Sequence, residues 1–120
     1  PPASLLAGNF PDSDGGFLPP WGQEILPREQ QAEILVPQGQ ARNLRVRLSQ
    51  NPASGGRAMV TVRRNGVDTV LRCEIADLDV DCSSEEAVPF SAGDRLSISY
   101  TETQAQRARV LFVLEFVMPE

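Results

Sequence analysis

The sequence contains no histidine and no lysine, and all 11 of its basic residues are arginines. A chain without imidazole has no Ser-His or Cys-His nucleophile pair. Without a lysine amine it has no Schiff-base nucleophile and no P-loop lysine to bind phosphate. Metal sites built on histidine are excluded as well, which leaves two cysteines and the carboxylates as ligands. We therefore expect a structural or binding protein without a cofactor, and not an enzyme.

Positive charge is in deficit, with 16 acidic residues against 11 basic ones and a net charge of −5. Because neutralising phosphates takes a net basic face, neither nucleic acid nor anionic lipid is an expected partner. Long apolar runs are missing too. The longest, residues 110–114, is far shorter than the ~20 residues of a membrane-spanning helix. The length of 120 residues suits a single domain.

Proline and glycine gather near the start of the chain, where the first 40 residues hold seven of the ten prolines and five of the nine glycines. Proline removes a backbone donor and glycine loosens the chain, so residues 1 to about 22 are predicted to be extended and not a packed element. We divide the chain into an arm, residues 1–33, and a body, residues 34–120. The arm is more apolar than a solvated tail. Its predicted anchors on a neighbouring surface are Leu5, Phe10, Phe17 and Trp21, although Trp21 would equally pack on its own body.

From residue 42 onward, apolar and polar residues alternate with a period of two, which is typical of half-buried β-strands. Residues 57–64 and 67–75 flank Asn65-Gly66, a pair that tolerates the positive φ of a type I′ turn, and are predicted to form an antiparallel hairpin. A further alternating run covers residues 95–100, after a predicted turn at residues 92–94.

Residues 28–35 fit either a helix of about two turns, confined by Pro27 and Pro37, or the start of the first strand of the sheet. We favour the strand. Short strands with turn signals between them, and no convincing amphipathic helix, predict an all-β fold. The fold class is therefore an antiparallel jelly-roll sandwich with an extended N-terminal arm.

The last predicted strand, residues 110–117, is apolar on both faces except at Glu115. Such a strand is either central and covered on both sides or exposed to another subunit. In the second case the even-numbered residues fill the sandwich, and Leu111, Val113 and Val117 form a subunit interface. The alternative is a central strand beneath the folded arm. Glu115 is expected to pair with an arginine such as Arg109 or to cap the sheet edge.

Four runs of the sequence carry a family resemblance: VPQGQARNLRV (residues 36–46), VTVRRNGVDT (60–69), CEI (73–75) and SAGDRLSI (91–98). Together they resemble small bacterial and phage proteins with a trimeric jelly roll like that of tumour necrosis factor and the complement globular domain. The resemblance covers residues 34–117. It implies ten short strands in two sheets, a threefold axis lined by one sheet with the first and last strands near it, and no catalytic residues.

The resemblance implies a homotrimeric structural protein on the surface of a phage virion, either a capsid decoration or a fibre-tip protein. Its arm would then tie the trimer to a neighbouring subunit or to a larger assembly such as the capsid shell. The alternative is a carbohydrate- or receptor-binding module of a phage fibre or a bacterial surface protein, which would also be extracellular. A secreted head domain on a collagen stalk is a third option, although no Gly-X-Y repeat is present.

Cys73 and Cys82 are separated by eight residues, an even number that lets them face each other across a hairpin centred on residues 77–78. They form either a disulfide or two buried thiols, and their spacing does not suit zinc. Asp77, Asp79 and Asp81 alternate along the same stretch. Carboxylates in this pattern could bind Ca²⁺, but a solvated acidic edge is the commoner explanation, so no metal is expected.

Arginines project from two of the predicted runs, Arg45 and Arg47 from one strand face and Arg57, Arg63 and Arg64 from the next run. Usually such arginines form a solvated face. They could also meet the acidic residues of segment 74–86 in a neighbouring subunit or shell, because arginine binds carboxylates in a bidentate manner. Exposed pairs contribute only ~0–1 kcal/mol each, so they would set the register of an assembly more than its affinity.

Overall fold

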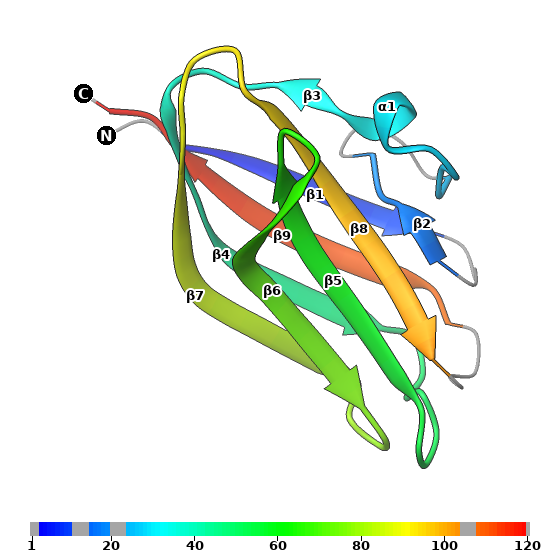
Figure 1. Cartoon of the computed structure of the whole chain (residues 1–120). Helices are drawn as coiled ribbons and strands as arrows, with labels where there is room; N and C mark the ends of the chain where they lie inside the picture. The colour runs from blue at the N-terminus through cyan, green and yellow to red at the C-terminus, as the bar shows by residue number, and fades with distance from the viewer. Residues whose placement is uncertain (1–2, 11–14, 20–23, 104–107, 120) are drawn as a thin grey trace.

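The computed structural model describes residues 3–10, 15–19, 24–103 and 108–119, which form a sandwich of two antiparallel sheets (Figure 1). Its elements, in chain order, are β1 (Ala3–Phe10), β2 (Gly15–Phe17), α1 (Glu29–Ala32), β3 (Ile34–Leu35), β4 (Gly39–Leu48), β5 (Arg57–Arg64), β6 (Val67–Ala76), β7 (Asp81–Phe90), β8 (Arg95–Thr103) and β9 (Val110–Val117). The all-β prediction is confirmed.

The strands pair in a nested manner. In the four-stranded sheet the order is β1-β9-β4-β7, and in the five-stranded sheet it is β2-β8-β5-β6, with β3 also paired to β8. The hairpin β5-β6 is thus enclosed in sequence by the pairs β4-β7, β3-β8 and β1-β9. A long antiparallel hairpin rolled into two layers has this connectivity, as the jelly-roll prediction requires.

The core lies between the two sheets and is filled by alternate residues of each strand. On β9 the buried residues are Val110, Phe112, Leu114 and Phe116, as predicted. The opposite layer contributes Val60, Ile75 and Tyr100, among others. This alternation leaves the odd-numbered side chains of β9 on the far face of the four-stranded sheet.

The predicted hairpin and turn are confirmed. Strands β5 and β6 pair antiparallel, and the residues between them, Asn65 and Gly66, have φ values of 52° and 81°. Both backbones therefore adopt the left-handed conformation that a tight hairpin turn needs. Before β8, Gly93 has a φ of 88°, and the Asp94 carboxylate accepts a hydrogen bond from the Ser91 N–H at 2.8 Å.

Residues 28–35 combine both of the structures that the sequence allows. Glu29–Ala32 form the single turn of α1, and Ile34–Leu35 form β3, which pairs with β8. The preference for a strand is therefore correct only for the end of this segment.

The described part of residues 1–22 is packed, which corrects the prediction that this segment is not a packed element. β1 pairs with β9 along eight residues, and β2 pairs with β8. The physical reason is that β9 would otherwise be an open edge with unpaired backbone groups. Phe10 adds a buried ring stacked on Phe112, with centroids 6.0 Å apart, and Gly8 leaves the space that this ring occupies.

A disulfide joins the two sheets at their other edge. Cys73 lies on β6 of the five-stranded sheet and Cys82 on β7 of the four-stranded sheet, with Cα atoms 5.8 Å apart. Of the two states that the sequence left open, the structure has the disulfide, and it lies across the layers of the sandwich and not across a paired hairpin.

Candidate functional site

The surface that concerns function is the outer face of the four-stranded sheet, which we call the outer face. Two cross-strand rows define it: Asn9–Leu111–Arg47–Asp81 and Ala7–Val113–Arg45–Ser83, each running through β1, β9, β4 and β7. The predicted interface residues Leu111, Val113 and Val117 all lie on this face. Apolar side chains on β1 and β9 thus adjoin arginines on β4.

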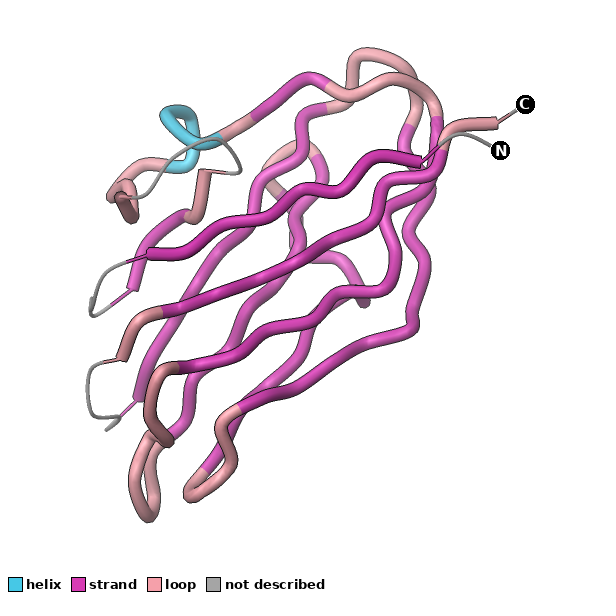
Figure 2. The backbone as a smooth tube through the Cα atoms, turned by 180° about the vertical axis from the view of Figure 1, so that it is seen from behind, coloured by secondary structure: helices cyan, strands magenta, loops and turns pink. Residues whose placement is uncertain are grey.

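The outer face is open. Leu5 is 67% exposed and Leu111 is 39% exposed, and Figure 2 shows no described segment crossing these four strands. The outer face of the other sheet differs, because the segment with α1 lies against it. Thr61 and Ser97 point outward there but are only 6% and 1% exposed. The apolar residues of β9 therefore do not lie beneath the described part of the arm, which was the alternative arrangement.

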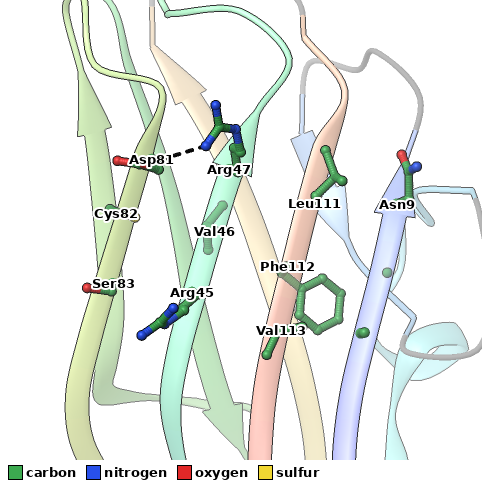
Figure 3. A pocket seen from close by; sticks show the side chains of 12 residues that line it. Asn9, Arg45, Val46, Arg47, Asp81, Cys82, Ser83, Leu111, Phe112 and Val113 are labelled. Atoms are coloured by element: carbon green, nitrogen blue, oxygen red, sulfur yellow. Dashed lines mark ion pairs between the residues drawn. The ribbon is translucent and has the colours of Figure 1, made fainter.

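One end of the outer face is hollowed into an open depression of about 920 Å³ (Figure 3). All four strands contribute to it. Its lining residues are Ala7, Gly8, Asn9, Arg45, Val46, Arg47, Asp81, Cys82, Ser83, Leu111, Phe112 and Val113. The single aromatic ring among them, Phe112, is buried in the core, so the depression has no exposed ring on which a sugar could stack.

The arginines of the outer face differ in their contacts. Arg42 Nε lies 2.5 Å from Glu115 Oε1, and Asn43 Nδ2 lies 3.4 Å from the same oxygen. Glu115 is therefore paired with an arginine as expected, but with Arg42 and not Arg109. Arg47 makes a longer ion pair with Asp81, at 3.7 Å (Figure 3). The Arg45 side chain has no ion-pair or hydrogen-bond partner in the described part of the chain.

The three predicted arm anchors that the structure describes fall in different surroundings. Leu5 lies exposed on the outer face, Phe10 is in the core and Phe17 is half-buried on β2. Trp21 lies outside the described residues. Leu5, Phe10 and Phe17 therefore do not form one common anchoring surface.

Asp77, Asp79 and Asp81 make separate contacts in the described structure. Asp77 Oδ1 accepts a hydrogen bond from the Gly55 N–H at 2.8 Å, whereas Asp81 pairs with Arg47. Within the described ranges, no three Cys, Asp or Glu side chains are grouped so as to hold an ion. No helix of the described chain is long and apolar enough to cross a bilayer.

A polar cluster that the sequence analysis missed fixes α1 to the five-stranded sheet. Glu29 Oε2 accepts hydrogen bonds from Ser97 Oγ at 2.5 Å and from Arg63 Nε at 2.7 Å, and Arg63 also pairs with Asp68. Burial raises the pKa of Glu29, but the hydrogen bonds from Ser97 and Arg63, together with the charges of Arg63 and Arg95, outweigh it and lower the pKa below 4.5. The partners of Glu29 lie on other strands, so no local pattern signals the cluster.

No protein-family model matches this chain, and no curated protein sequence matches it. Among solved structures, it is similar to a chain of the "acidic stable capsid structure of Helicobacter pylori bacteriophage KHP30", with a TM-score of 0.58 and 14% sequence identity. The alignment covers 98% of this chain and 89% of that one. At this identity the likeness shows a common fold over nearly the whole chain.

Proposed function

We propose that this chain is a non-enzymatic structural protein of a phage virion, and that it assembles into a homotrimer through the outer face. The observation that carries the proposal is the open apolar half of that face, where Leu5 on β1 adjoins Val113 and Val117 on β9, and Leu111 extends the apolar row toward Asn9. The fold likeness to a chain of a phage capsid supports the virion setting. The resemblance to trimeric jelly rolls, which covers residues 34–117, supports a threefold axis near its last strand, β9, in this sheet.

The exposed apolar side chains favour a partner made of protein. Water-exposed apolar groups gathered on one sheet face mark an interaction surface, whereas single exposed ones are ordinary. Two charged residues within this surface are already paired, because Arg42 and Glu115 neutralise each other. A second protein surface could therefore cover them without burying an unpaired charge.

The position of β1 in the sandwich changes the role that we propose for the arm in attachment. β1 and Phe10 belong to the sandwich, so the first 22 residues are not free to be removed without damage to the fold. We propose that Leu5 contributes to the subunit contact from the outer face, and that the trimer as a whole decorates a shell or a fibre tip.

Substitution Val113→Asp tests the contact. A carboxylate in the middle of the covered surface should weaken the free energy of association by about 2 kcal/mol or more per subunit contact. Substitution of a central interface residue typically has an effect of this size. The variant should therefore sediment as a monomer while its circular dichroism remains that of the wild type. The matched control is Val70→Asp, since Val70 is also an exposed strand valine but lies on β6. Equal sedimentation of the two variants would contradict the proposed contact.

The virion role is tested by co-sedimentation of the purified protein with phage particles from the same source. Saturable association with particles, together with a blank glycan array, supports a shell component. Saturable binding to a glycan without association with particles would instead indicate the carbohydrate-binding alternative.

A further inference from the structure

The depression on the outer face contains a cationic side chain that its own chain leaves unmatched. Arg45 lies beside Val113 and has no ion-pair partner in the described ranges, whereas Arg42 and Arg47 each have one. The depression is therefore apolar on its β9 side and positively charged on its β4 side. Its complement is a surface that presents an apolar side chain next to a carboxylate.

The turn between β6 and β7 presents such a pair. Leu78 is 71% exposed at this turn, and the neighbouring Asp79 is exposed with no side-chain partner in the described part of the chain. A large apolar side chain at the tip of a turn, flanked by carboxylates, has no role in the packing of its own sandwich.

The turn is held in a defined shape. Asp77 has a φ of 56°, its N–H donates to the Gly56 carbonyl at 3.0 Å, and its carboxylate accepts from the Gly55 N–H. The Asp79 N–H donates to the Ala76 carbonyl at 3.1 Å. A turn ordered in advance loses little conformational entropy when it docks.

The turn and the depression lie at the same end of the molecule. The Leu48 N–H donates to the Val80 carbonyl at 2.8 Å, which places the turn just beyond the row that contains Arg47 and Leu111. A rotation about an axis parallel to the strands keeps every group at its height along that axis. In a ring built by such a rotation, one surface of each copy meets a different surface of the next. An axis of this direction would bring the turn of one copy to the end of its neighbour's depression that contains Arg47 and Leu111.

We infer that the turn at residues 77–80 of one copy docks into the depression of the next, with Leu78 against Leu111 and Val113 and with Asp79 paired to Arg45. This inference rests on the proposed trimer and names the contact within it. Arg45 lies two residues before Arg47 on β4, ~6.6 Å farther from the turn, so the docked turn has to extend past the row of Arg47 for Asp79 to meet it. Arg47 is already held by Asp81, so Arg45 is the free partner.

A charge exchange tests this contact. Arg45→Asp and Asp79→Arg, made separately, each place like charges opposite one another and should weaken trimer association about tenfold or more. The double variant restores opposite charges at every contact of the ring and should recover most of the affinity. Arg72→Asp is the matched control, because this exposed arginine lies on β6, in the other sheet. Association is measured by sedimentation over a dilution series, with circular dichroism to verify the fold.

Recovery in the double variant supports the docked turn. The docked turn would be overturned if the single variants associate as tightly as the wild type. It would also be overturned if the double variant loses as much affinity as the two single variants combined. If Val113→Asp still dissociates the trimer in that case, the proposed interface stands and only the assignment of the turn fails. If the wild type is itself monomeric, the proposed trimer fails, and this inference fails with it.

Discussion

Single side chains hold the segment with α1 against the five-stranded sheet, and Glu29 is the clearest example. Its carboxylate receives hydrogen bonds from a serine on β8 and an arginine on β5, so one side chain joins α1 to two strands. Hydrogen bonds to a charged group contribute about 1.5–3 kcal/mol each when they are sheltered from water. Arg63 gains from the same contact, because the hydrogen bond to Glu29 raises the pKa of its guanidinium.

Removing the charge of Glu29 should make stability depend less on pH. The folded state lowers the pKa of Glu29 below 4.5, so its contribution is complete above pH 4.5 and is lost as the pH falls through the lowered pKa. We predict that Glu29→Gln lowers the free energy of unfolding by about 1–3 kcal/mol near neutral pH, and that its difference from the wild type shrinks in acid.

Urea unfolding at about pH 6 and about pH 2.5 measures this effect. The control is Glu86→Gln, which removes a carboxylate that is exposed on β7. A Glu29→Gln defect that stays constant across this pH range would show that the ionised carboxylate is not what stabilises α1.

At the scale of elements, β1 behaves as a structural strand. Its backbone completes the four-stranded sheet, and its last residue places a phenyl ring in the core. Its outward residues are Leu5, Ala7 and Asn9, so the strand also borders the proposed interface. The strand thus stabilises the sandwich and extends the surface that neighbours would cover.

Deleting residues 1–22 should therefore unfold the protein and not merely detach it. The deletion exposes the edge of β9 and removes Phe10 and Leu18, both fully buried. Loss of a buried Phe alone costs about 3–5 kcal/mol, a large part of a small domain's stability. Thermal melts of the truncated chain, of Phe10→Ala and of the surface variant Leu5→Ser measure this. Unchanged melting of the truncated chain would show that the first strands are dispensable.

Some elements are predictable from the sequence because their signals are local. The alternation of residues 57–64 and the turn pair Asn65-Gly66 both act within a few residues, and the structure follows them. The inward residues of β9 are equally clear, since a period of two separates its faces. The sequence also indicates that the opposite face of β9 needs a partner, although not what covers it.

Other features depend on contacts between distant residues. The proline and glycine content of the first 40 residues reports only local backbone preferences. β1 forms because its backbone pairs with the edge of β9, more than 90 residues later in the chain. In the same way, Glu29 finds partners 34 and 68 residues away. The pairing of Arg42 with Glu115 also follows from the register of β4 on β9, which a backbone irregularity near Asn43 shifts.

At the scale of the whole molecule, the two outer surfaces of the sandwich differ. The segment with α1 lies against one, whereas the other carries exposed leucine and half-buried valine side chains beside arginines. A disulfide joins the sheets at the β6-β7 edge, next to the turn that we assign to the subunit contact. In a closed ring of identical copies, a neighbour would cover the open face of each copy, and the β6-β7 edge of each copy would meet the next one.

The molar mass in solution tests the central claim most directly. Sedimentation equilibrium of the wild type should give three times the 13.1 kDa mass of the chain, with dissociation only on strong dilution. A stable, monodisperse species of 13.1 kDa at all concentrations would contradict the trimer.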